Sequence, residues 1–149
     1  MDCGRASRLS RVRRPGAAAL ISGVLLAAGC VEPGVTSLDD VRADLAREGA
    51  VVRTIGTTIG LPFSVGANRV EVDGREIRVF EYRDVASRER DSSSITMGGY
   101  RVHGSPVEWS AEPHFWADGR VLVLYVGEDE ALIGLVTRVV GPPLDVGTG

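Results

Sequence analysis

The sequence predicts an α+β domain, with a small antiparallel sheet of four to five strands and about three helices in the order αβββαββα. Three observations lead to this fold class. A capped helical segment opens the domain near residue 38, an Asp-Gly hairpin follows at 69–82, and an apolar strand at 121–126 runs into an amphipathic helix. We expect the helices to pack mainly on one face of the sheet.

The first helix is predicted from its caps and from its apolar spacing. Leu38, Val41 and Leu45 recur at helical intervals. Ser37 is a favourable N-cap residue, and Gly49 suits the position just after a helix end. A helix of about eleven residues is therefore expected, followed by a strand that starts near residue 50 and enters a loop around Gly56, Gly60 and Pro62.

The clearest hairpin lies at residues 69–82. Asp73-Gly74 between two alternating runs is typical of a type I′ turn. With that turn, four aliphatic side chains share one face of the sheet: Val70, Val72, Ile77 and Val79. Phe80 and Tyr82 fall on the opposite, charged face by strict alternation, so we expect a bulge near Phe80 or a second element that covers it.

The second half of the domain is predicted in four steps. Asp84 is a plausible N-cap of a short helix, and residues 91–106, rich in serine and glycine, are expected to form an exposed, mobile loop.

Two strands within 107–127 are joined by a turn at 117–119, and the apolar run 121–126 belongs in the centre of the sheet. The last helix carries an apolar stripe and stops at 141–143; the stripe is Leu132, Leu135, Val136 and Val139. The domain is thus expected to span 37–143, before a flexible tail at 144–149.

The first thirty residues have the layout of a secretory signal peptide. An arginine-rich start ends at Arg14, an apolar segment covers 17–28, and small residues precede Cys30. About 20 apolar residues are needed to span a membrane, so this segment is too short for a permanent transmembrane helix. Arg13-Arg14 lacks the continuation of a twin-arginine signal, and general secretion is favoured.

The tetrad Ala27-Ala28-Gly29-Cys30 resembles the lipobox of bacterial lipoproteins. In that family the cysteine thiol receives a diacylglyceryl group and a signal peptidase cuts just before it, here between Gly29 and Cys30. Ala27 stands where leucine is commonest. The resemblance implies a mature chain that begins at a lipidated Cys30 and continues through a tether at 30–36, with the alternative of an ordinary secretory signal in which Cys30 has no role.

Charge and cysteine content exclude several classes of function. After residue 30 the chain has 12 arginines against 19 acidic residues, a formal net charge of −7, and such an acidic body does not suit nucleic-acid binding. Cys3 and Cys30 both precede the domain, which therefore has neither an internal disulfide nor a cysteine-based zinc site.

The body also resembles a group of small bacterial lipoproteins in which a signal peptide and lipobox precede one domain. The matching segments are Pro62-Phe63-Ser64-Val65-Gly66, the hairpin at 72–82, the stretch at 109–127 and Val139-Val140-Gly141-Pro142. They cover most of residues 38–143. No reaction is assigned to that group, so the resemblance implies a domain boundary and an envelope location only. The helix after Tyr82 is shorter and richer in arginine here.

Candidate chemistry centres on one aromatic cluster, whose members are Trp109, His114, Phe115, Trp116 and Tyr125. His114 with Glu108 or Glu112 could act as a general base or hold half a metal site. The alternative is a strand-end histidine bonded to a backbone carbonyl, with its aromatic neighbours filling the core or its rim. His103 has no partner at metal-ligand spacing, so we expect no metal and no cofactor.

Other catalytic motifs are missing from the sequence. Ser64 and the serines at 92–94 lack a nucleophile elbow, and no phosphate-binding glycine loop is present. The leading hypothesis is a lipid-anchored protein of the bacterial envelope, attached to a membrane through Cys30, whose domain binds another envelope protein without catalysis. The alternative is a small envelope hydrolase or ligand carrier that uses the aromatic cluster.

Overall fold

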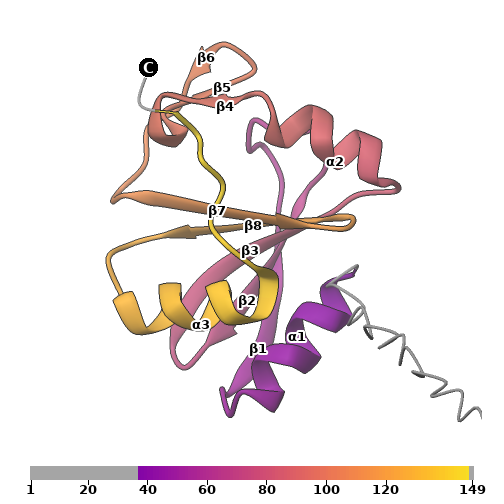
Figure 1. Cartoon of the computed structure of the whole chain (residues 1–149), viewed down its shortest axis with the longest axis vertical. Helices are drawn as coiled ribbons and strands as arrows, with labels where there is room; N and C mark the ends of the chain where they lie inside the picture. The colour runs from indigo at the N-terminus through magenta and orange to yellow at the C-terminus, as the bar shows by residue number, and fades with distance from the viewer. Residues whose placement is uncertain (1–36, 148–149) are drawn as a thin grey trace, which may run out of the picture. The chain divides into compact units, whose positions relative to one another are not determined.

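The structure, a computed structural model, describes residues 37–147 and shows an α+β domain (Figure 1). Its main sheet has five antiparallel strands in the order β1-β2-β3-β8-β7, and a second sheet has the order β4-β5-β6. The predicted order αβββαββα is present, with the second sheet and a 3₁₀ turn inserted before the last two strands. The elements are α1 (Leu38–Arg47), β1 (Val52–Thr58), β2 (Ala67–Val72), β3 (Arg75–Glu81), α2 (Val85–Ser92), β4 (Ile95–Thr96), η1 (Met97–Gly99), β5 (Arg101–Val102), β6 (Ser105–Pro106), β7 (Pro113–Asp118), β8 (Val121–Val126) and α3 (Glu130–Val140).

Each α-helix begins at a side chain that accepts from its first turn. Ser37 Oγ accepts from the Asp40 N–H at 3.2 Å, and Asp84 accepts from the Ser87 N–H at 2.8 Å. Asp129 does the same at α3. These bonds satisfy N–H groups that have no partner within the helix. The predicted caps at Ser37 and Asp84 are confirmed.

The β2–β3 hairpin has the predicted register. Val70 pairs with Ile77 across the two strands, and Val72 pairs with Arg75. Asp73 and Gly74 both have positive φ, 48° and 80°, as a type I′ turn requires. The turn therefore sets which side chains face the core.

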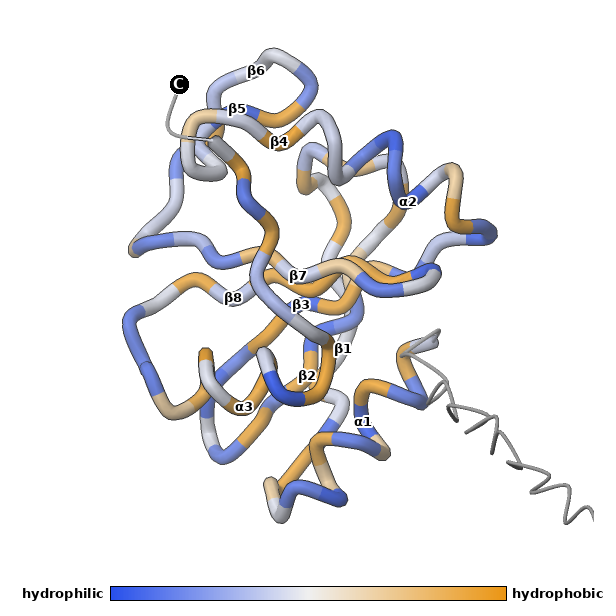
Figure 2. Tube along the Cα trace, in the orientation of Figure 1, coloured by the Kyte–Doolittle hydropathy of each residue, from blue (hydrophilic) through white to orange (hydrophobic). Residues whose placement is uncertain are grey.

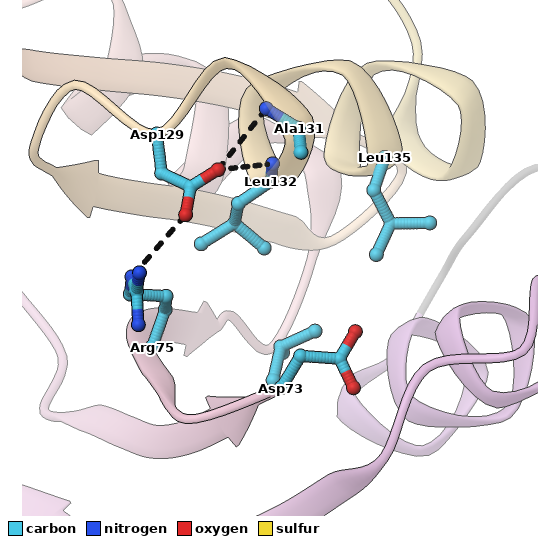
Figure 3. A pocket seen from close by; sticks show the side chains of 7 residues that line it. Asp73, Arg75, Asp129, Ala131, Leu132 and Leu135 are labelled. Atoms are coloured by element: carbon cyan, nitrogen blue, oxygen red, sulfur yellow. Dashed lines mark hydrogen bonds and ion pairs between the residues drawn. The ribbon is translucent and has the colours of Figure 1, made fainter.

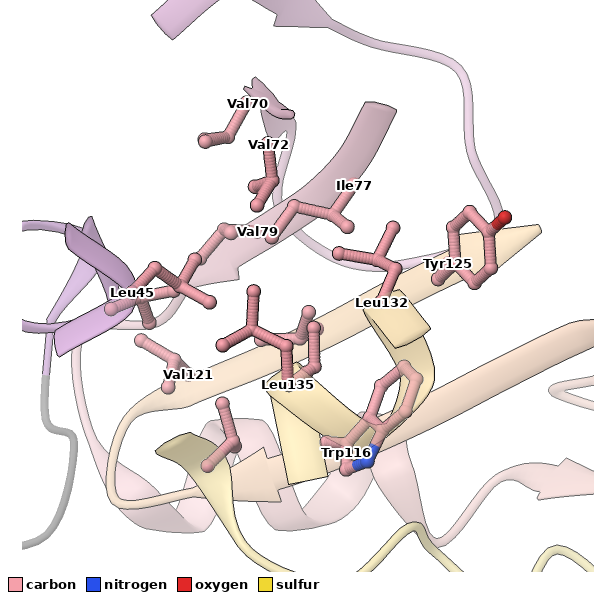
Figure 4. Packing of buried hydrophobic residues seen from close by; sticks show 14 residues of the cluster. Leu45, Val70, Val72, Ile77, Val79, Trp116, Val121, Tyr125, Leu132 and Leu135 are labelled. Atoms are coloured by element: carbon pink, nitrogen blue, oxygen red, sulfur yellow. The ribbon is translucent and has the colours of Figure 1, made fainter. Parts of the chain in front are cut away.

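One face of the main sheet packs against α1 and α3 (Figures 1 and 4). The four aliphatic residues of the hairpin are buried there, as predicted, together with Trp116 and residues from both helices. Figure 2 shows hydrophobic residues gathered where the sheet meets these helices and hydrophilic ones along α2. The largest part of the core thus lies between the sheet and its first and last helices.

The opposite face of the sheet is covered by α2, the small sheet and the chain's last described residues (Figure 1). Phe80 and Tyr82 are buried in this second cluster, and Phe63 meets Phe80 edge-on with ring centroids 4.7 Å apart. The second covering element expected near Phe80 is therefore present. Two of the three helices share one face, and α2 lies on the other.

The segment at residues 91–106, predicted to be an exposed loop, is largely exposed but is not a loop: it forms the end of α2, η1 and the small sheet. Ile95 pairs with Val102 between β4 and β5, and both side chains are buried in the second cluster. Positive φ angles at Met97 and His103 turn the chain back sharply on itself. Strands of two residues are too short to show an alternating pattern, so this packing could not be predicted from the sequence.

Three boundaries also differ from the predicted ones. β1 continues past Gly56 to Thr58, with a bulge between Thr54 and Gly56. The turn between the last two strands is formed by residues 119–120 rather than 117–119. Beyond residue 143, where the tail was expected, the Leu144 N–H donates to the Phe115 carbonyl at 2.7 Å, so the folded part continues along β7.

Candidate functional site

The predicted aromatic cluster is divided by the sheet. Because side chains alternate along β7, Trp116 joins the core beneath α3 with Tyr125, and Phe115 joins the opposite cluster, where Trp109 meets it edge-on at 6.2 Å. His114 lies with the first group, its ring stacked on Tyr125 at 6.1 Å. The five residues thus form two groups and do not converge on one cavity.

His114 occupies a strand end and bonds to the backbone. Its Nε2 lies 2.9 Å from the Gly127 carbonyl, just beyond the end of β8. The ring's partner is therefore a carbonyl rather than Glu108 or Glu112, which is the arrangement given above as the alternative to a general base. Gly127 in turn donates its N–H to the Glu112 carbonyl at 2.9 Å, which closes this end of the sheet.

Both tryptophans donate their indole N–H inside the fold. Trp116, fully buried, donates to Thr137 Oγ1 on α3 at 3.1 Å. Trp109 donates to the Gly99 carbonyl in η1 at 2.9 Å. Buried indole groups require such partners. Trp116 therefore links β7 to α3, and Trp109, which packs against Phe115 on the opposite face of β7, bonds to η1.

A polar centre that sequence reasoning missed surrounds Asp91. This carboxylate is 2 % exposed and lies at the end of α2. One oxygen accepts from the Ser64 N–H, the Ser64 hydroxyl and the Tyr82 hydroxyl at 2.7, 2.8 and 3.0 Å, and the other is 3.0 Å from His103 Nε2. The partners come from three separate segments, so no local motif could have found the group.

Hydrogen bonds to the Asp91 carboxylate stabilise its charged form. Burial raises the pKa of the Asp91 carboxyl, but the hydrogen bonds from Ser64, Tyr82 and His103 outweigh it, and the net pKa is lowered. Burial, followed by the charge of Asp91, raises the pKa of the Tyr82 hydroxyl, which therefore remains a donor. Ser64 donates to the carboxylate directly and not through a histidine. The buried carboxylate of Asp91 therefore holds four segments of the chain together through hydrogen bonds. The group lacks the hydrogen-bonded series of nucleophile, base and acid that forms a catalytic triad.

A small pocket lies between the β2–β3 turn and the start of α3 (Figure 3). Its volume is about 130 Å³, and Leu132 and Leu135 supply apolar lining. At its rim, one oxygen of Asp129 accepts from the N–H groups of Ala131 and Leu132, and the other pairs with Arg75 at 3.2 Å. Ligand pockets generally measure roughly 300–1,000 Å³, so this one is small for an organic ligand.

Within residues 37–147, no group of three or more histidine, cysteine or acidic residues is placed to hold a metal ion. The same described part of the chain contains no helix long and apolar enough to cross a membrane.

In comparisons with known proteins, no family model, curated protein or solved structure matches the chain.

Proposed function

We propose that this chain is a lipid-anchored protein of the bacterial cell envelope whose domain binds a partner without catalysis. The observation that carries the proposal is the tetrad Ala27-Ala28-Gly29-Cys30 at the end of a short apolar segment. A second support is the resemblance of the body to small bacterial lipoproteins. Two or three acyl chains on Cys30 would hold the protein firmly, since each buried methylene contributes about 0.8 kcal/mol.

A binding role is supported by what the reactive side chains do. His114, His103 and Ser64 are among the groups that sequence reasoning considered for chemistry, and each of these three bonds within the fold. A general base needs a ring nitrogen directed at a substrate, and a nucleophile needs a base beside it. Because these side chains are bonded inside the domain, the geometry favours a domain that binds a partner through its surface.

The length of the tether limits where a partner can be. Residues 31–36 separate Cys30 from Ser37, and seven residue steps span at most roughly 25 Å. A domain held this way works close to the membrane surface. The partner class that fits is therefore another envelope protein.

The anchor is tested by growing a bacterial host with labelled palmitate. The wild type and Cys3→Ser take the label and fractionate with membranes, and Cys30→Ser does neither. Cys3→Ser is the matched control, because it removes the chain's other cysteine. Label that persists on Cys30→Ser, or label on none of the three, contradicts the proposal.

The binding role is tested by cross-linking in intact cells. A specific adduct of the processed chain is expected, and it should be lost when the domain is unfolded by a core substitution such as Trp116→Asp. The absence of any adduct, repeated across growth conditions, would count against a binding role.

A further inference from the structure

The connection between β1 and β2 is uncharged and carries an exposed apolar side chain. We define the apolar loop as residues 59–66, which join Thr58 at the end of β1 to Ala67 at the start of β2. No charged residue occurs from position 54 to position 68, the longest such stretch within residues 37–147. Ile59 is 88 % exposed, more than any other exposed large hydrophobic side chain in that part of the protein.

The middle of the apolar loop is fixed to the domain. Phe63 packs edge-on against Phe80 in the second core cluster. Ser64 donates its N–H and its hydroxyl to the buried Asp91 carboxylate at 2.7 and 2.8 Å. These contacts hold the loop in place and leave Ile59 outside the core.

The apolar loop leaves the sheet at the end where the tether enters the domain. The Leu38 N–H, at the start of α1, donates to the side chain of Glu81, the last residue of β3, at 3.4 Å. Phe80, beside Glu81, pairs with Ala67, which in turn pairs with Thr58. Neighbouring strands lie about 4.8 Å apart, so the loop begins roughly 10 Å from the end of β3. The residues that precede Leu38 therefore join the domain near this loop.

Charge separates the two ends of the sheet. At the far end, the β2–β3 turn and the start of α3 meet at the pocket rim and carry four acidic residues: Asp73, Glu128, Asp129 and Glu130. Around the start of α1 and the end of β3, three acidic side chains are paired with arginines: Asp39 with Arg42, Glu81 with Arg120, and Asp84 with Arg83. Anionic lipid headgroups repel an acidic surface, so the end with the apolar loop is the one that can approach a membrane closely.

We propose that the apolar loop rests on the surface of the membrane that holds Cys30, with the Ile59 side chain inserted between the lipid headgroups. This inference rests on the proposed function, because the lipid anchor and a tether of at most roughly 25 Å keep the domain at that surface. Insertion removes the apolar surface of Ile59 from water, and an uncharged loop avoids the cost of bringing ionised groups to the hydrocarbon boundary. Two attachment points then orient the domain, and its acidic end faces away from the membrane.

Fluorescence in lipid vesicles tests this docking. The full chain with Cys3→Ser and Ile59→Cys is expressed in a bacterial host, where Cys30 takes the lipid and position 59 keeps the free thiol. The thiol is labelled with nitrobenzoxadiazole, and the protein is reconstituted at high dilution in vesicles of phosphatidylethanolamine and phosphatidylglycerol. Emission should shift to shorter wavelength, and lipids with a nitroxide on the acyl chain should quench it.

Val51→Cys is the matched control for this probe. Val51 is also apolar and is 66 % exposed, but it precedes the other end of β1, roughly 20 Å from Thr58. A probe at position 51 should stay in water, with lipid quenching severalfold weaker than at position 59. Circular dichroism checks that both exposed substitutions leave the fold intact.

A second set of variants tests the Ile59 side chain itself. With the probe on Thr57→Cys, which is exposed two residues before Ile59, adding Ile59→Asp should reduce lipid quenching severalfold, because a carboxylate is costly at the membrane interface. Adding Val51→Asp instead should leave the quenching unchanged.

Two results would overturn the docking. One is a probe at position 59 that lipid quenches no more than the probe at position 51. The other is a blue shift at position 59 that lipid quenchers do not reach and that is lost on further dilution, since a second copy then covers the loop. The palmitate experiment separates either failure from failure of the anchor. A labelled chain with residue 59 in water keeps the anchor and loses the docking, whereas an unlabelled chain whose residue 59 is quenched by added vesicles does the reverse.

Discussion

The Asp91 centre makes a quantitative prediction about stability. Asp91→Ala removes the acceptor of the Tyr82 hydroxyl, which is buried in the second core cluster. An unpaired buried hydroxyl costs about 1–3 kcal/mol, and the two bonds from Ser64 add about 0.5–1.5 kcal/mol each. The Ser64 donors lie at an exposed residue and regain part of this from water. The variant should therefore lose about 2–4 kcal/mol of unfolding free energy.

The assay is urea unfolding of a chain that starts after Cys30, at pH 7, followed by circular dichroism. Glu89→Ala on the same helix is the control, because the Glu89 side chain is exposed and forms a loose ion pair with Arg88 at 3.8 Å. That substitution should change stability by less than about 0.5 kcal/mol. In a Tyr82→Phe background, Asp91→Ala should cost less by about 1–2 kcal/mol, since the stranded hydroxyl is absent.

The penalty should also depend on pH. Because the pKa of Asp91 is lowered in the folded state, its carboxylate stabilises the fold fully above the ordinary aspartate pKa of about 3.9. That contribution is lost as the pH falls through the folded pKa. The difference between wild type and Asp91→Ala should therefore shrink below pH 4. Equal stability of the two proteins at pH 7, or a difference that grows in acid, would refute this account of the centre.

Two further predictions concern the contacts around β8 and α3. Gly127 has a φ of +155°, and a Cβ there would overlap with the ring hydroxyl of Tyr125, so Gly127→Ala should destabilise the domain by about 1–3 kcal/mol. Gly134→Ala, in α3 with space for a methyl group, is the control and should be neutral or stabilising in thermal unfolding. Thr137→Val leaves the Trp116 indole N–H without its acceptor and should cost about 1–3 kcal/mol, whereas Thr137→Ser should cost much less. Equal midpoints for the two Thr137 variants would show that the hydrogen bond contributes little.

Local signals in the sequence were enough to predict the main sheet and its helices. Ser37 and Asp84 cap helices because a short polar side chain reaches the N–H groups of the first turn, which depends on neighbouring residues alone. Asp73-Gly74 sets a register for the same kind of reason. Where one short stretch determines a structure, sequence reasoning predicted it.

The candidate sites depend on contacts between distant residues. Asp91 lies 27 positions from Ser64 and 12 from His103 in the chain, and nothing near any of them indicates the meeting. His114 was singled out because histidine and tryptophan stand close together in the sequence. Alternation along β7 then separates Phe115 from its two neighbours, so closeness in the sequence did not make a shared site.

The first and last helices meet in one core cluster, and this affects how the chain is made. Val41 and Leu45 of α1 pack in the same cluster as Leu135 and Val136 of α3, almost a hundred residues later. During synthesis the N-terminal helix leaves the ribosome first, and the α3 part of its packing surface is missing until the end of the chain appears. The nascent domain therefore stays open until translation is nearly complete, which is the state in which a polypeptide can be threaded through a narrow export channel.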